Sequence, residues 1–265
     1  MTNRIIRYTI FESNQSGHGG DRRTAQISDF LKEMGINWYK IPVSMEKPSL
    51  SFNFFRKLVI IFKLYLQVFF IVKKRFNPKV FYRTVSMVCQ FKGVFEIKRN
   101  KDLSVVLWET TRTELSFVVP LFKRKGFKIV ALPNNLESLV SKQLSGLSGR
   151  ISPVWLFEEI ELLKRCEVVF TISREETLLL QQMGIDAYYL PYYPSERNLN
   201  FLLEIRKIRN DFKNTIPSKR KKILMLGSAS NYPTRIGMEN IIDFFQEVSA
   251  DKFELIIAGY GTLQR

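Results

Sequence analysis

Short apolar runs rich in β-branched and aromatic residues alternate along this chain with segments of helical periodicity. The runs that we expect to form strands are residues 5–11, 36–43, 104–108, 127–132, 168–172 and 187–190. This alternation is typical of βαβ units, in which helices connect parallel strands. The sequence therefore predicts an α/β protein built on parallel sheets.

Two helices in this part of the chain have residues suited to their ends. Asp21 is a suitable N-cap for a helix over residues 22–34, and Gly35 is a suitable stop for it. Ser173 and Glu176 have the spacing of a capping box, which predicts a helix that ends near Gly184.

The pattern of a strand followed by a helix starts again near residue 223. Residues 196–222 combine an amphipathic helix with Pro217 and four consecutive basic residues, which is typical of a connector. A strand at 223–226, a helix at 236–248 and a strand at 253–258 follow. We therefore predict two Rossmann-like domains, a first over 1–195 and a second over 223–265 that is present only in its first βαβ portion. Because that portion cannot bury its apolar faces alone, we expect roughly a hundred further residues, the remainder of a typical domain.

The charge of the chain indicates an anionic partner. The formal net charge is +16 in 265 residues, and residues 54–99 hold eleven Lys/Arg against one Glu, a local charge of +10. Nucleotide diphosphates, acidic lipids and nucleic acids all qualify as partners. The aromatic residues lie on apolar stripes and do not alternate with Arg, so nucleic acid is disfavoured. Two distant cysteines and the lack of an apolar leader favour the cytoplasm.

Residues 52–76 are apolar except for a polar stripe. The spacing of Arg56, Lys63, Gln67 and Lys74 places them on one side of a helix. Bilayer crossing takes roughly 20 apolar residues, more than this segment offers without interruption. Two alternatives remain open, a helix buried against a sheet and a helix at the membrane interface. For the second we expect acidic headgroups to contact Arg56, Lys57, Lys73, Lys74 and Arg75.

Loops after parallel strands are the usual place of ligand binding, and four such loops carry candidate residues. In the first loop, Gly17, Gly19 and Gly20 let backbone N–H groups approach an anion or a sugar, and His18 is either functional or simply solvated.

The next two loops offer a carboxylate and an amide. Glu109 is either a general base or sugar ligand, or the partner of a helix end or of Arg112. Asn134 and Asn135 either form a turn or reach into a cleft.

In the second domain, Gly227 and Ser228 offer hydrogen-bond donors to a phosphate, and Arg235 offers charge. No dinucleotide fingerprint, phosphate loop of the Walker type or metal-ligand pair is present in the sequence, so we expect neither a cofactor nor a metal.

With these residues in place, the chain resembles GT-B glycosyltransferases of the retaining, family 4-like group. The similarity is carried by the 17–20 glycine loop, by residues 134–137 (NNLE), by 168–176 (VVFTISREE) with Gly184 and residues 190–191, and by 224–239 with 257–261. The resemblance implies metal-independent transfer of a hexose-type sugar from a nucleotide-diphosphate donor to a glycan or lipid-linked acceptor, in the synthesis of a cell-envelope glycan.

Two departures from the family bear on this reading. The family often has a histidine where this chain has Asn134, and its carboxylate-rich donor motif lies beyond residue 265. We therefore expect this stretch of chain to be inactive alone. The alternative is a non-catalytic relative that binds membranes or glycans with a degenerate pocket.

Overall fold

The chain forms two compact units, which are considered separately. This computed structural model describes residues 4–14, 19–41, 52–72, 78, 81–82, 84–86, 94–100, 103–109, 111, 116–140, 153–192, 196–215, 220–229, 232–248, 251–259 and 261–262.

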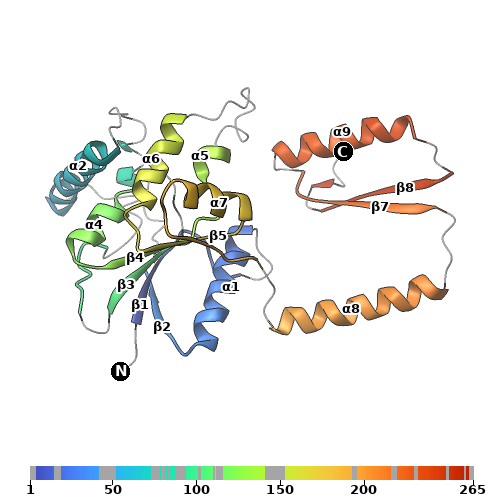
Figure 1. Cartoon of the computed structure of the whole chain (residues 1–265), viewed down its shortest axis with the longest axis horizontal. Coiled ribbons are helices and arrows are strands. Elements are labelled where there is room, and N and C mark those ends of the chain that lie inside the picture. Colours follow the sequence, from blue (N-terminus) through green and yellow to red (C-terminus); the bar gives the residue numbers. More distant parts are fainter. Residues whose placement is uncertain are drawn as a thin grey trace. The chain divides into compact units, whose positions relative to one another are not determined.

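The larger unit is built on a six-stranded sheet in which every pairing is parallel (Figure 1). The strands follow the order β2-β1-β3-β4-β5-β6 across the sheet. They are β1 (Arg4–Tyr8), β2 (Asn37–Lys40), β3 (Leu103–Trp108), β4 (Lys128–Ala131), β5 (Val168–Thr171) and β6 (Ala187–Tyr189). All six strands predicted for this part of the chain are present, and the prediction of an α/β fold on parallel strands is confirmed.

Helices cover both faces of this sheet. Helix α1 (Gly19–Glu33) buries Ile27 and Leu31 against Ile5 and Leu107 on one face. The other face carries α2 (Phe52–Val72), α4 (Val118–Arg124), α5 (Glu137–Val140), α6 (Pro153–Leu163) and α7 (Arg174–Gln182). Side chains alternate along each strand, so neighbours in sequence such as Ile5 and Ile6 enter different cores.

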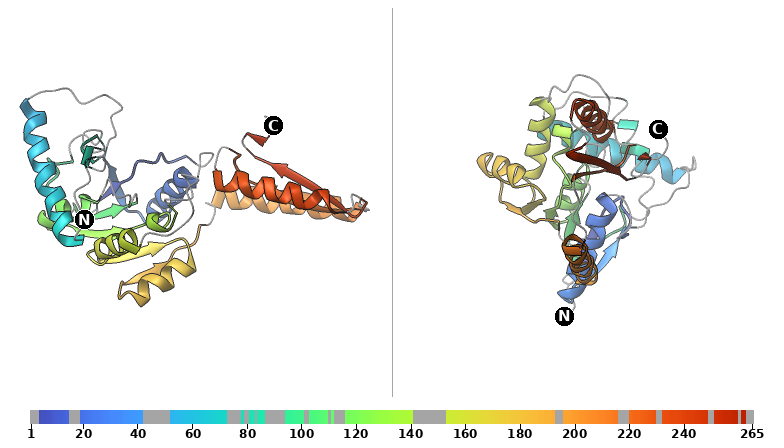
Figure 2. Two further views of the ribbon diagram at one scale, coloured as in Figure 1. Left: turned by 90° about the horizontal axis from the view of Figure 1, so that it is seen from above. Right: turned by 90° about the vertical axis from the view of Figure 1, so that its right-hand side faces the viewer.

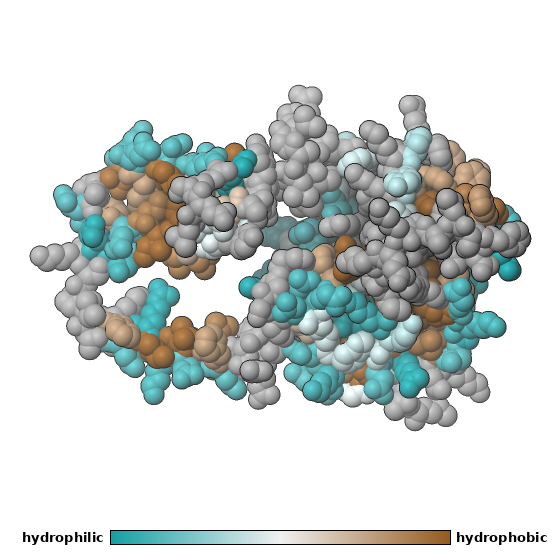
Figure 3. All heavy atoms as spheres, turned by 180° about the vertical axis from the view of Figure 1, so that it is seen from behind, coloured by the Kyte–Doolittle hydropathy of each residue, from teal (hydrophilic) through white to brown (hydrophobic). Residues whose placement is uncertain are grey.

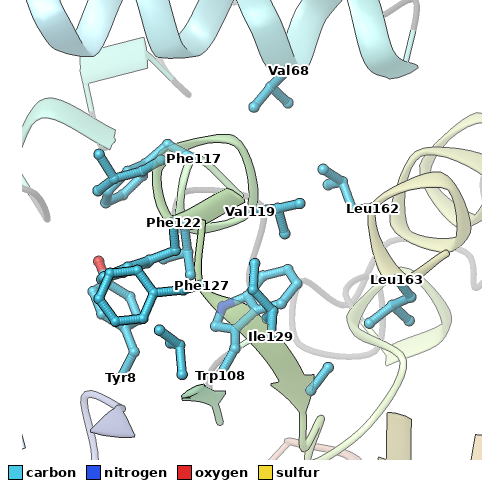
Figure 4. Close-up of a cluster of buried hydrophobic side chains, with 14 of the residues drawn as sticks. Tyr8, Val68, Trp108, Phe117, Val119, Phe122, Phe127, Ile129, Leu162 and Leu163 are labelled. Atoms are coloured by element: carbon cyan, nitrogen blue, oxygen red, sulfur yellow. The ribbon is translucent and has the colours of Figure 1, made fainter. Parts of the chain in front are cut away.

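The core on the face that carries α2 and α4 to α7 is the larger of the two, and it is rich in aromatic side chains (Figure 4). Tyr8 and Phe117 meet edge to face with ring centroids 6.2 Å apart, and Phe122 meets Phe127 in the same way at 5.3 Å. Trp108 is 1% exposed within this core. Edge-to-face pairs of this kind add to the stabilisation that area burial provides.

The residues at the helix ends bear out some predicted caps and correct others. Gly35 and Gly184 adopt positive φ angles of 66° and 77° just beyond α1 and α7, as predicted. Asp21 does not cap α1, because the helix begins two residues earlier, and its side chain accepts from the Glu12 N–H. Ser173 caps α7 by accepting from the Glu176 N–H, but Glu176 does not complete a capping box, since its carboxylate bonds to Leu136.

The smaller unit contains a separate two-stranded parallel sheet. It comprises α8 (Glu196–Thr215), β7 (Lys221–Leu226), α9 (Tyr232–Gln246) and β8 (Phe253–Ala258), and α9 runs alongside the two strands (Figures 1 and 2). Met238 of α9 is buried. Strands β7 and β8 pair over their whole length, from Lys221 opposite Phe253 to Leu226 opposite Ala258. The predicted strands, their parallel pairing and the helix between them are confirmed, whereas the GT-B architecture stays a prediction.

Candidate functional site

The carboxyl ends of the strands in the larger sheet lie at one edge, because all six strands run in the same direction. Tyr8 at the end of β1 pairs with Trp108 of β3, which pairs with Ala131 of β4. The loops after these strands therefore leave the sheet side by side, which is where ligands bind in open α/β sheets.

The glycine loop after β1 is described only in part. Gly17 and His18 lie outside the described residues, so their roles stay predictions. Gly19 and Gly20 begin α1, and a Cβ atom on Gly20 would lie 2.5 Å from the ring of Phe11, whereas one on Gly19 would meet nothing within 4 Å. Gly20 therefore lets the first turn of α1 pack against Phe11, three residues after the end of β1.

Glu109 follows β3 and is bound by a buried arginine. Arg7 donates from Nε to Glu109 Oε1 at 2.6 Å and from Nη2 to Glu109 Oε2 at 2.8 Å, and the two side chains are 2–3% exposed. Thr24 Oγ1 of α1 also donates to Oε2, at 3.1 Å. Glu109 thus forms a salt bridge with Arg7. Arg112, the partner proposed from the sequence, lies outside the described residues.

The same arginine fixes α1 to the sheet. Arg7 donates to Ser28 Oγ at 2.5 Å and to the Thr24 carbonyl at 2.9 Å, and its guanidinium lies 5.9 Å from the centre of the Trp38 ring. Ser13 of the glycine loop donates to Ser28 Oγ as well. A charged pair this deeply buried needs such additional hydrogen bonds to offset its desolvation.

A second set of contacts joins α1 to the segment after β6. Arg23 donates to the carbonyls of Leu190 and Pro191, and Gln26 donates to Pro191 as well. Arg23 and Gln26 are both buried. Helix α1 therefore connects the three chain segments that follow β1, β3 and β6.

The loop after β4 is held by two glutamates from other elements. Glu159 of α6 accepts from the backbone N–H groups of Glu137 and Ser138 and from the Ser138 hydroxyl, at 2.6–3.0 Å. Glu176 of α7 accepts from the Leu136 N–H through Oε1 at 2.9 Å. Burial raises the pKa of both carboxyl groups, and these hydrogen bonds offset part of that rise.

Two side-chain groups of this loop region have unused hydrogen-bonding capacity. Asn134 is half-buried, and its amide makes no hydrogen bond within the described part of the chain. Oε2 of Glu176 is buried and likewise has no partner there. Glu176 lies in the first turn of α7, just beyond the end of β5. A carboxyl group with a raised pKa at such a position is a candidate functional group. The sequence did not indicate this role, because Ser173 and Glu176 have the spacing of a capping box and Glu176 was therefore interpreted as a capping residue.

In the smaller unit, two glycine backbones meet where β7 and β8 end. A Cβ atom on Gly259 would lie 1.8 Å from the carbonyl oxygen of Gly227, and one on Gly227 would lie 2.2 Å from Cγ2 of Thr234 in α9. The φ angle of Gly259 is 141°, which only glycine adopts readily. Glycine at both positions thus brings two strand ends and the first turn of α9 into direct contact.

Arg235 lies in the first turns of α9 and is half-buried. Its Nε atom is 3.7 Å from Oε1 of Glu239, one helical turn later, which is a loose pair. The first turn of α9 contains no acidic residue, so the positive end of the helix dipole is not offset there. Gly227, Ser228 and Arg235, which the sequence predicted to bind phosphate, therefore lie around one helix N-terminus.

Within the described ranges, no cluster of three or more His, Cys, Asp or Glu side chains has a metal-binding arrangement. Comparison with known protein families, with characterised proteins and with solved structures finds no match to this chain. The resemblance to GT-B glycosyltransferases therefore rests on the residues quoted above.

Proposed function

We propose that this protein transfers a sugar from a nucleotide-diphosphate donor to a glycan or lipid-linked acceptor without a metal. The observation that carries the proposal is the close contact of Gly227 and Gly259 beside the N-terminus of α9. The Gly227 N–H donates to the Ala258 carbonyl, so the donors available beside this contact come from the first turn of α9, whose leading N–H groups have no partner within the helix. Together with Arg235 these N–H groups suit a diphosphate.

The chemistry of sugar transfer explains why such a site is useful. The donor loses a nucleoside diphosphate, on which negative charge develops as the bond to the sugar breaks. Fixed donors and a guanidinium stabilise that charge most when they are already in place. The N-terminus of α9 and Arg235 supply these groups, which supports a reaction that needs no metal.

On the larger sheet, Asn134 and Glu176 support binding of a sugar hydroxyl. The amide can donate and accept, and Oε2 of Glu176 can accept a proton or a hydrogen bond. The raised pKa of Glu176 suits proton transfer nearer to neutral pH. Glu109 is better suited to positioning, since both of its oxygens already accept from Arg7. The role of His18 stays a prediction.

The non-catalytic alternative is favoured by one observation, the engagement of Glu109. With both oxygens bound to a guanidinium, this carboxylate cannot take up a proton without breaking the pair. A protein with the same loops and no working base would bind glycans without transferring sugar.

The donor site can be tested by titrating UDP, GDP and ADP into the full-length protein by calorimetry. We expect one of the three to bind, and Arg235→Gln to weaken its binding by about tenfold, the effect of losing one charged hydrogen bond of about 1.5 kcal/mol. Arg206→Gln on the exposed surface of α8 is the matched control and leaves the affinity unchanged. Absence of binding by all three nucleotides would contradict the donor site.

A further inference from the structure

Helix α2 has two apolar faces on opposite sides. One face consists of Ile61, Leu64, Tyr65 and Val68, each at most 6% exposed, and packs into the larger core. The buried-helix alternative from the sequence is therefore confirmed for this face. It does not account for the opposite face of the helix.

The outer face of α2 is a stripe of exposed apolar side chains. Phe55, Val59, Phe62 and Phe70 are 59, 53, 44 and 74% exposed. With 3.6 residues per turn, these four positions fall within about 80° of the helix circumference. Figure 3 shows brown apolar atoms gathered over α2. Exposed apolar stripes of this kind mark interaction surfaces.

Basic side chains border this stripe. Arg56 and Lys63 are exposed, and their seven-residue spacing sets them on one line along the helix, next to the apolar stripe. Gln67, predicted to continue the polar line, is half-buried. Of the other predicted membrane contacts, Lys73, Lys74 and Arg75 lie outside the described residues, as does the side chain of Lys57.

We propose that the outer face of α2 binds the surface of a bilayer that contains anionic lipids. Phenylalanine side chains suit the boundary between headgroups and acyl chains, and the basic border suits acidic headgroups. The local charge of +10 over residues 54–99 adds long-range attraction to such a surface and disfavours pairing with a second, equally basic copy.

The helix would lie along the surface. None of the described helices combines the length and the apolar character that crossing a membrane takes. Because one face of α2 packs into the protein core, only the side chains of its opposite, exposed face can insert into a bilayer. The inference concerns a surface separate from the donor site, so it stands or fails independently of sugar transfer.

Co-sedimentation with vesicles tests the proposal. Vesicles of phosphatidylcholine alone are compared with vesicles of equal parts phosphatidylcholine and phosphatidylglycerol. We expect stronger binding to the second kind, and a fall in binding as salt is added. Equal binding to both kinds, or no binding to either, overturns the proposal.

Two pairs of variants assign the binding to α2. Phe62→Ser/Phe70→Ser is expected to reduce binding by at least about tenfold, whereas Leu178→Ser/Met183→Ser removes similarly exposed side chains from α7 and its end and leaves binding intact. Arg56→Gln/Lys63→Gln is expected to reduce binding to anionic vesicles by about tenfold, whereas Arg206→Gln/Lys207→Gln removes the same charge from α8 with no such effect.

Thermal melting establishes that all four variants fold, as expected for exposed positions. Equal losses in the test and control variants contradict the assignment to α2. The protein could instead fail to bind vesicles and form dimers that the Phe62→Ser/Phe70→Ser substitutions dissociate. That result would identify a second copy of the chain as the partner of this face and would overturn the membrane proposal.

Discussion

Glu109→Gln is expected to lower the free energy of unfolding of the larger unit by about 3–5 kcal/mol, the range for breaking a buried ion pair. Glutamine offers Arg7 a single oxygen in place of two and no compensating charge. Arg7 would then stay charged at a position that is 2% exposed. Urea unfolding followed by tryptophan fluorescence measures this, because Trp38, Trp108 and Trp155, the three tryptophans of the chain, all belong to the larger unit.

Two further variants separate the buried pair from general effects of substitution. Glu161→Gln removes a carboxylate of α6 that pairs with Lys164 near the surface, and it is expected to cost less than about 1 kcal/mol. Arg7→Met/Glu109→Met removes both charges and is expected to recover most of the loss. A stable, fully folded Glu109→Gln protein that has lost only activity would show that Glu109 acts in chemistry and not in positioning.

Gly259→Ala is expected to destabilise the smaller unit by about 3 kcal/mol or more. The backbone angle alone costs about 1–3 kcal/mol for a residue other than glycine, and the added methyl group overlaps the Gly227 carbonyl, which adds about 1–3 kcal/mol of overpacking. The smaller unit contains no tryptophan, so the effect appears as an early transition in far-ultraviolet circular dichroism while tryptophan fluorescence is unchanged.

Gly184→Ala is the matched control for this substitution. Gly184 also has a positive φ angle, but a Cβ atom there would meet nothing within 4 Å. Its cost is expected to stay near 1–2 kcal/mol, roughly that of a left-handed residue alone. Similar losses for Gly259→Ala and Gly184→Ala would mean that the contact with Gly227 does not constrain the structure.

The strands were predictable from sequence because each is a short, mostly apolar run bounded by residues that favour turns. Residues 253–258 are an example, since the predicted and observed strands coincide. The start of α1 was predicted three residues late, because Asp21 is a residue type that favours the N-cap position, whereas its carboxylate accepts from the Glu12 N–H. The type of a residue does not determine which of several nearby N–H groups its carboxylate accepts a hydrogen bond from.

The candidate site was less predictable because its key contacts join residues far apart in sequence. Arg7 and Glu109 are separated by 102 positions, and nothing local to Glu109 identifies its partner. Thr24 and Ser28 are polar residues of the kind expected on the surface of a helix, yet they are buried, and their oxygens accept hydrogen bonds from Arg7. For α2 the sequence left a buried helix and a helix at the membrane interface as alternatives, since apolar periodicity cannot distinguish a buried face from an exposed one.

Sugar transfer is tested most directly by incubating a sugar nucleotide with the full-length protein and a glycan or lipid-linked acceptor, and following the donor by phosphorus NMR. We expect release of the nucleoside diphosphate from one donor among UDP-, GDP- and ADP-sugars, and we expect this release to be lost in Gly259→Ala and retained in Gly184→Ala. Donors that all stay intact, with protein whose two units are folded, would contradict it.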